Sequence, residues 1–180
     1  MQNAQGVVEI KDREQMMDFV LRKPPTVRGY ALHRMAAGLA DGEKVLFADC
    51  GDHVLLRTDK PLDVEKRSVR TFAVNDVVGF ELRACVGKKV KGKHVYFRTS
   101  DWRSRHAWLA RQGEALGFAV ITVHCTAEMQ TVTKGDRTFT VDQTDFTGVL
   151  KVADVEQFNK AIALGVGNKG KAFGFGMLVI

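Results

Sequence analysis

The sequence predicts an α+β protein made of two similar halves. Apolar residues alternate with polar ones over several short stretches, as in half-buried strands, and recur at helical spacing in others. A polar segment of weak periodicity, Asp59–Asp76, separates two such runs. Hydrophobic residues make up 45% of the 180 residues and only 3 are proline, which excludes a disordered or fibrous chain. We therefore expect two globular domains, 1–70 and 71–180.

The N-terminal half carries patterns for strands and one clear helix. Residues 12–21 place Met16, Met17 and Val20 at near-helical spacing, and a Pro-Pro break follows them. The other predicted elements are a first strand at Val7–Ile10, a helix at Tyr30–Leu39, and a hairpin of strands 44–49 and 53–58.

The C-terminal half has a more complete order of elements. We expect a strand around Phe80–Ala84, a helix from Ser100 or Asp101 to Leu116, a strand at Phe118–Val123, and a strand at 146–152. A further helix opens at Asp154 with Gln157, and a last strand covers Phe175–Ile180. The first of these two helices, which ends at Leu116, is expected to bury Trp102, Trp108, Leu109 and Leu116. This order is the split βαβ of a ferredoxin-like (βαββαβ) domain, with an extra hairpin at Thr131–Val141 between the middle strands.

The N-terminal half shows a looser version of the same order, so the predicted fold is a tandem ferredoxin-like pair with a C-terminal glycine-rich loop.

The sequence has no apolar run near the roughly 20 residues that span a bilayer, and its start lacks signal-peptide character. We expect a cytoplasmic protein. The three cysteines are far apart and form no CxxC, which argues against a disulfide framework and a zinc site. We expect no metal or other cofactor.

Positive charge is concentrated in one part of the chain. Lysine and arginine outnumber aspartate and glutamate by 27 to 21. Nine of these cations and a single acid, Asp101, lie between Arg83 and Arg111. Two sheets side by side leave a cleft in which such a strip could face an extended polyanion. The charge therefore permits a nucleic-acid partner.

Glycines cluster near the C-terminus. Gly165–Gly170 satisfies GxGxxG, but this turn follows a predicted helix and leads to a strand, so no helix N-terminus faces a pyrophosphate. The plain alternative is a helix-to-strand turn, which needs one or two glycines. Five within twelve residues favour a loop that faces a ligand. These are Gly165, Gly167, Gly170, Gly174 and Gly176.

One pair of side chains suits proton-transfer chemistry. Tyr30 and His33 lie three residues apart in a predicted helix, with Arg34 beside them. An imidazole can accept and return protons near pH 7, a phenol can position or donate one, and a guanidinium can bind phosphate. These groups suit RNA cleavage by the RNA's own 2′-hydroxyl. The alternative is a histidine with a purely structural role.

Several segments together resemble a known family. The run GVGNKGKAFGFGMLVI (Gly165–Ile180), with Phe146–Val152 before it, resembles the glycine-rich end of the CasE family of CRISPR repeat-processing endoribonucleases. Tyr30–Arg34 resembles that family's YxxHR helix, Phe80–Ala84 its FRLRA strand, and Arg105–Leu109 its AWL helix.

This resemblance implies a tandem ferredoxin-like fold and metal-independent cleavage of precursor CRISPR RNA at the base of the repeat hairpin. The products would carry a 2′,3′-cyclic phosphate and a 5′-hydroxyl. The enzyme would remain on the mature RNA as a subunit of a Cascade-like interference complex. His33 would transfer protons, with Tyr30 as its partner at the scissile phosphate. A non-catalytic subunit that holds the RNA hairpin, and a ferredoxin-like RNA-binding module unrelated to CRISPR, stay open as alternatives.

Resemblance and charge together identify candidate contacts to RNA. A strip of cations follows the Phe80 strand, others lie on the next helix, and the rest lie at the Thr131–Val141 hairpin, beside His33 and in the glycine-rich loop. The predicted RNA-binding residues are Arg34, Arg83, Lys88, Lys89, Lys91, Lys93, Arg98, Arg103, Arg105, Lys134, Arg137, Lys169 and Lys171.

Overall fold

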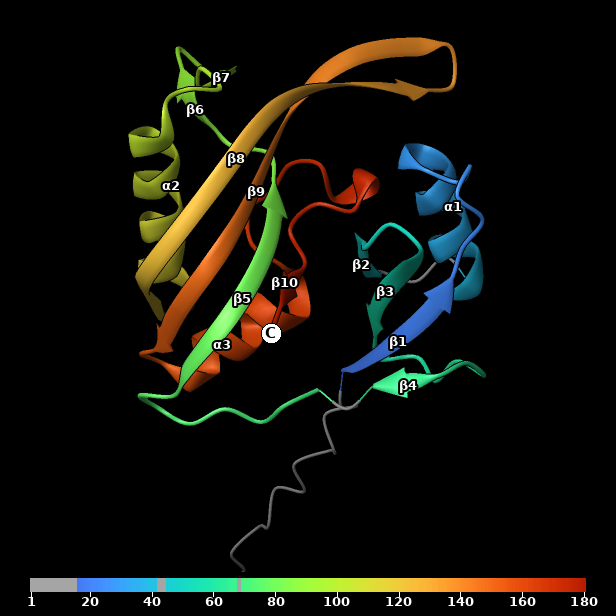
Figure 1. Cartoon of the computed structure of the whole chain (residues 1–180), viewed down its shortest axis with the longest axis horizontal. Coiled ribbons are helices and arrows are strands. Elements are labelled where there is room, and N and C mark those ends of the chain that lie inside the picture. Colours follow the sequence, from blue (N-terminus) through green and yellow to red (C-terminus); the bar gives the residue numbers. More distant parts are fainter. Residues whose placement is uncertain (1–15, 42–44, 68) are drawn as a thin grey trace, which may run out of the picture.

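The computed structural model describes residues 16–41, 45–67 and 69–180, and Figure 1 shows the whole chain. The described residues form two four-stranded sheets and a separate two-stranded hairpin. The strand predicted at Val7–Ile10 lies outside the described residues, as do residues 12–15 of the segment with near-helical spacing. The proposed domain boundary after residue 70 falls between the last strand of the first sheet and the first strand of the second.

The N-terminal sheet is antiparallel and has the strand order β2-β3-β1-β4. One helix, α1, follows its first strand. This is a ferredoxin-like order that lacks the second helix. Its elements are β1 (Met17–Arg22), α1 (Gly29–Leu39), β2 (Leu46–Asp49), β3 (His53–Thr58) and β4 (Lys66–Arg67).

The near-helical spacing around Met17 was misleading, because the described part of that segment is the strand β1. Met17, Phe19 and Leu21 pack with α1 in one apolar cluster. Val20 joins a second cluster on the opposite face of the sheet. Since both faces of β1 are covered, its sequence lacks the alternation that marks a strand with one exposed face.

The C-terminal sheet has the strand order β10-β5-β9-β8, which is the order of a ferredoxin-like domain. Its helices α2 and α3 contact each other and share one large core with the sheet. The elements are β5 (Val77–Ala84), β6 (Gly87–Val90), β7 (Lys93–Tyr96), α2 (Trp102–Leu116), β8 (Phe118–Lys134), β9 (Arg137–Val152), α3 (Val155–Leu164), the 3-10 turn η1 (Lys171–Phe173) and β10 (Leu178–Val179).

Three details of this half differ from the predictions. The Thr131–Val141 hairpin is the far end of β8 and β9, which pair continuously and arch toward α1 in Figure 1. The additional hairpin is β6–β7. Trp102 is 54% exposed, because it is the first residue of α2 and lies outside the core. The last strand begins at Leu178, since the residues before it belong to the glycine-rich loop.

A buried arginine of the N-terminal half joins the two halves. Arg57 on β3 pairs with Asp18 on β1 at 2.6 Å. The same guanidinium donates to the backbone carbonyls of Ile162, at 3.1 Å, and Leu178, at 2.9 Å. An apolar cluster of Leu46, Leu55 and Met177 lies in the same interface. The N-terminal sheet is therefore fixed against α3 and β10, which sets where α1 lies.

No helix in the described part of the chain is both long and apolar enough to cross a membrane.

Candidate active site

Tyr30 and His33 lie together on α1. Leu32 and Ala36 bury one face of this helix, and the tyrosine and histidine stand half-buried beside that face. Their ring centroids are 5.4 Å apart, with an angle of 36° between the rings. His33 also stacks on Phe47 of β2 at 6.2 Å. The YxxH spacing thus brings a phenol and an imidazole into contact, as the sequence predicted.

The imidazole of His33 is not committed to a protein partner. Its Nδ1 atom is buried and has no hydrogen-bond partner among the described residues. A histidine whose ring nitrogen donates to a fixed carbonyl or carboxylate is held in one tautomer. No hydrogen bond from Nδ1 within the described residues fixes the tautomer of His33 in this way.

The glycine-rich loop folds against α1 from the other half of the protein. The backbone N–H of Gly176 donates to the Arg83 carbonyl at 2.7 Å, and that of Val166 donates to the Gly176 carbonyl at 2.7 Å. These bonds hold η1 in contact with α1. Lys171, the first residue of η1, donates to the Leu164 carbonyl at 2.5 Å. The loop therefore contacts α1, the helix that carries Tyr30 and His33.

Gly174 shows why this loop needs glycine. Its φ of +81° lies in the left-handed region, and a Cβ atom would come within 2.8 Å of Cε2 of Phe47. Phe47 is the ring on which His33 stacks. The glycine predicted to face a ligand thus has a structural task as well, because it leaves room for the ring that supports His33.

For the RNA cleavage that the sequence resemblance implies, we expect Gly174→Ala to slow the reaction about tenfold or more, because moving Phe47 misplaces His33 and small displacements of reacting groups are costly. Single-turnover cleavage rates of the two proteins measure this effect. Gly92→Ala is the matched control, since Gly92 has a φ of +78° but an added Cβ atom would meet nothing within 4 Å. Equal rates for Gly174→Ala and Gly92→Ala would refute the positioning role.

A cavity of about 980 Å³ opens next to Tyr30. It lies between the start of α1, the β2–β3 turn, the extended β8–β9 hairpin and the glycine-rich loop. Lys134 lies over the Tyr30 ring, with its Nζ atom 5.5 Å from the centroid. His33 does not line this cavity, so Tyr30 stands between the cavity and His33.

Sequence reasoning missed Lys23, which lines the same cavity. It is 7% exposed, and its Nζ atom lies 3.3 Å from Asp49 Oδ1 and donates to the Val27 carbonyl at 3.1 Å. A lysine beside two prolines gives no signal of burial. Only the pairing of β1 with β3 brings it to the β2–β3 turn.

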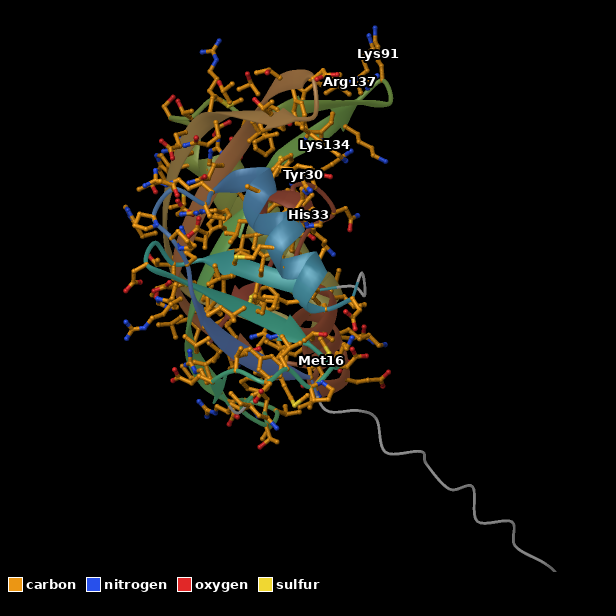
Figure 2. All side chains as sticks on the ribbon, turned by 90° about the vertical axis from the view of Figure 1, so that its right-hand side faces the viewer. Met16, Tyr30, His33, Lys91, Lys134 and Arg137 are labelled. Carbon is orange, nitrogen blue, oxygen red and sulfur yellow. The ribbon has the colours of Figure 1, made fainter. Side chains whose placement is uncertain are left out.

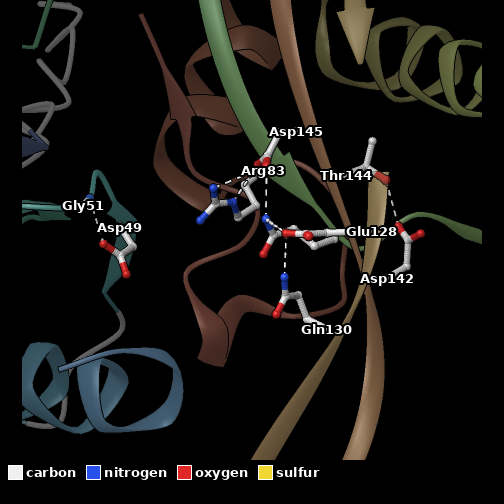
Figure 3. Close-up of polar contacts among 9 residues, drawn as sticks. Asp49, Gly51, Arg83, Glu128, Gln130, Asp142, Thr144 and Asp145 are labelled. Atoms are coloured by element: carbon white, nitrogen blue, oxygen red, sulfur yellow. Dashed lines mark hydrogen bonds and ion pairs between the residues drawn. The ribbon is translucent and has the colours of Figure 1, made fainter. Parts of the chain in front are cut away.

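Arg83 lies in the cavity wall within a polar network (Figure 3). Its Nε atom donates to Asp145 at 2.6 Å. Gln143 donates to the same Asp145 carboxylate at 3.0 Å and to Glu128 at 3.2 Å. The positive charge of Arg83 is therefore balanced by a neighbouring carboxylate.

Most of the predicted RNA contacts are exposed. Figure 2 shows Lys91, Arg137 and Lys134 above Tyr30 and His33 on the side that faces the viewer. Arg83 and Lys171 are half-buried. The exposed residues are Arg34, Lys88, Lys89, Lys91, Lys93, Arg98, Arg103, Lys134, Arg137 and Lys169.

Arg105 is the exception, and the prediction that it binds RNA is wrong for this structure. The residue is 0% exposed and pairs with Asp142 of β9 at 2.8 Å. It also donates to the carbonyls of Phe97, at 3.1 Å, and Arg98, at 3.2 Å. The Asp142 carboxylate in turn accepts the backbone N–H of Val86 at 3.0 Å. Arg105 thus fixes α2 to β9 and to the chain that leaves β7.

Burial also affects the chemistry of His94 on β7. It lowers the pKa of His94 below its ordinary value of 6.5, and the charge of Lys169 in the glycine-rich loop lowers that pKa further. The unfolded chain then binds the proton more readily than the folded one, so stability falls as the pH drops through about 6.5.

We expect the free energy of unfolding to fall more for the wild type than for His94→Gln when the pH is lowered from about 7.5 to about 5. Urea denaturation at both pH values measures the two decreases. Equal decreases would show that His94 does not contribute.

Within the described residues, no three histidine, cysteine or acidic side chains lie close enough together to hold a metal ion.

Comparison with solved structures shows the same fold in several relatives. The chain matches Thermus thermophilus Cse3 bound to an RNA representing a pre-cleavage complex, with a TM-score of 0.76 and 22% identity over 92% of this chain and 98% of that chain. It matches Cas6e from Escherichia coli K-12 with a TM-score of 0.71 and 22% identity, over the same shares. These matches confirm the expected tandem ferredoxin-like fold.

A third match comes from a larger assembly. One chain of the E. coli Cascade bound to a PAM-containing double-stranded DNA target has a TM-score of 0.55 and 21% identity, over 91% of this chain and 96% of that chain. A comparison with curated protein sequences gives no significant match. The family model described as CRISPR associated protein matches residues 14–180. The match spans nearly the whole chain, and the protein therefore belongs to this family, in agreement with its resemblance to the CasE type.

Proposed function

We propose that this protein is an endoribonuclease that cleaves precursor CRISPR RNA at the base of the repeat hairpin. The observation that carries the proposal is the contact between Tyr30 and His33 at the point where α1 meets the glycine-rich loop. The relatives of the same fold include Cse3, an endoribonuclease bound to RNA, which supports the proposed substrate. A relative found within Cascade supports retention of the product in an interference complex.

In the proposed reaction, the 2′-hydroxyl of the RNA attacks the adjacent phosphorus atom. His33 takes or returns the proton that this step requires, and Tyr30 positions the phosphate beside it. Cations around the site stabilise the additional negative charge of the transition state. The leaving oxygen takes up a proton and becomes a 5′-hydroxyl, and the other product keeps a 2′,3′-cyclic phosphate. This route needs no metal ion.

The exposed cations provide the proposed surface for the RNA stem. Double-stranded RNA is recognised mainly through its phosphates, its 2′-hydroxyls and its shape, for which lysine and arginine side chains are suited. Each phosphate contact releases counterions, so the affinity should fall steeply as salt is raised. Arg105 takes no part in this surface, because it is buried.

A cleavage assay in excess EDTA tests the proposal. A labelled repeat hairpin is incubated with the protein, and the 3′ end of the product is identified. We expect cleavage at the base of the stem with a 2′,3′-cyclic phosphate. Tight binding of an intact hairpin would instead favour the non-catalytic RNA-holding subunit. Equal affinity for an unrelated stem-loop would favour a general RNA-binding module.

A further inference from the structure

Trp102 is an exposed aromatic residue within the most basic part of the chain. It is 54% exposed, whereas the only other tryptophan of the sequence, Trp108, is 8% exposed and stacks on Phe146. Leaving an indole in water forgoes the gain from burying a large apolar surface. The position of Trp102 at the start of α2 therefore calls for a functional account.

The surroundings of Trp102 are positively charged and polar. The guanidinium carbon of Arg103 lies 5.1 Å from the indole centroid, and the His106 ring meets the indole edge-on at 5.4 Å. Hydrogen bonds from Ser104 lower the pKa of Asp101, the residue before Trp102, and the charges of Arg105 and of Lys88 on β6 lower it further. The carboxylate of Asp101 is already engaged, since it accepts the Ser104 N–H at 3.1 Å as the cap of α2.

The backbone below Trp102 is held firmly. Arg105, fully buried, donates to the carbonyls of Phe97 and Arg98 and so fixes the segment that connects β7 to α2. Asp101 closes the first turn of the helix. An aromatic ring on a rigid base loses little conformational entropy when a flat partner stacks on it.

We propose that Trp102 is a stacking platform for an unpaired nucleobase of the bound RNA, an inference that rests on the proposed function. Aromatic side chains beside cations bind single-stranded nucleotides in this way, because every base has a π-face and each phosphate seeks a positive charge. We commit to a nucleotide as the partner because the cations beside Trp102 can bind the phosphate that accompanies each base. The base can come from the hairpin loop or from a strand that flanks the stem.

Two readouts on the same RNA test this inference. Anisotropy of an end-labelled repeat hairpin measures affinity, and indole fluorescence reports stacking on Trp102. The Trp108→Phe variant leaves Trp102 as the only indole. If that variant folds poorly, the difference between the wild type and Trp102→Phe provides the same signal. Hairpins that lack the loop or the flanking strands locate the stacked base.

We expect the hairpin to quench Trp102 fluorescence, and removal of one unpaired segment to abolish the quenching. Trp102→Ala should weaken binding about tenfold, and Trp102→Phe less. Trp102→Ala should leave the slope of affinity against salt unchanged, because no phosphate contact is lost. The neighbouring Arg103→Ala should reduce that slope by about one.

The possible failures are distinguishable. If the wild type binds no RNA, the proposed function and this inference both fail. If the hairpin binds without changing the Trp102 fluorescence, and Trp102→Ala binds as the wild type does, the inference alone is overturned. A Trp102→Ala variant that binds RNA normally but no longer associates with other subunits would assign Trp102 to a protein interface instead.

Discussion

His33→Ala is expected to slow cleavage of the repeat hairpin by about 100- to 10,000-fold, the contribution typical of a positioned acid or base. The imidazole is the proton-transfer group that we propose for this site, and alanine offers no replacement. The affinity for the hairpin should remain almost unchanged, because the proposed contacts to the stem are cationic side chains and His33 is not among them. Single-turnover rates and anisotropy on the same RNA measure the two quantities.

Two further variants control this prediction. Lys89→Ala removes an exposed cation of β6 that is not part of the Tyr30–His33 site. It should weaken binding slightly and reduce its salt dependence, while the rate at saturating protein stays close to that of the wild type. Tyr30→Phe keeps the ring that contacts His33 and loses only the hydroxyl, so its rate distinguishes chemistry from packing. A His33→Ala protein that is folded and cleaves at the wild-type rate would refute the assignment.

Arg105→Ala is expected to reduce the free energy of unfolding by about 3–5 kcal/mol, the cost of leaving a buried carboxylate without its partner. The carboxylate that loses its partner is that of Asp142, which is 0% exposed. The carbonyls of Phe97 and Arg98 lose a donor as well. Urea denaturation at neutral pH measures the loss.

Arg103→Ala is the matched control, since Arg103 is an exposed arginine on the same helix. It should change stability by no more than about 0.5 kcal/mol and instead weaken RNA binding. The double variant Arg105→Met with Asp142→Leu should recover only part of the stability, because it removes the unpaired charge but leaves the Val86 N–H and the Phe97 and Arg98 carbonyls without these partners. If Arg105→Ala were as stable as Arg103→Ala, the buried pair would not hold α2 in place.

The elements that could be predicted from sequence are those with local signals. Asp101 and Asp154 each cap a helix through their side chains, and Gly117 ends α2 in the left-handed conformation. These signals act within a few residues, so they do not depend on the rest of the fold. The β2–β3 and β8–β9 hairpins were predicted for the same reason, because their turns are short.

Two errors concern side chains on α2. Arg105 was grouped with its charged neighbours, but its spacing to Trp108 and Leu109 already places it on the buried stripe of α2. Trp102 lies one turn earlier, beyond the part of the helix that covers the core. Helical periodicity therefore indicated that Arg105 is buried, but its charge led to the prediction that it is exposed.

The candidate site could be predicted only in part. The YxxH spacing is local, so the contact between Tyr30 and His33 followed from it. The support of His33 by Phe47, and the room that Gly174 leaves for that ring, depend on the second half folding against the first. The position of Lys23 depends likewise on a long-range strand pairing.

The most direct test of the proposed chemistry uses a modified substrate. A repeat hairpin with a single 2′-deoxy nucleotide on the 5′ side of the scissile bond lacks the attacking hydroxyl and differs in no other group. Our account predicts that the wild type binds this RNA as tightly as the unmodified hairpin and leaves it intact. Cleavage of the modified hairpin at the same bond would contradict attack by the 2′-hydroxyl and, with it, the role assigned to His33.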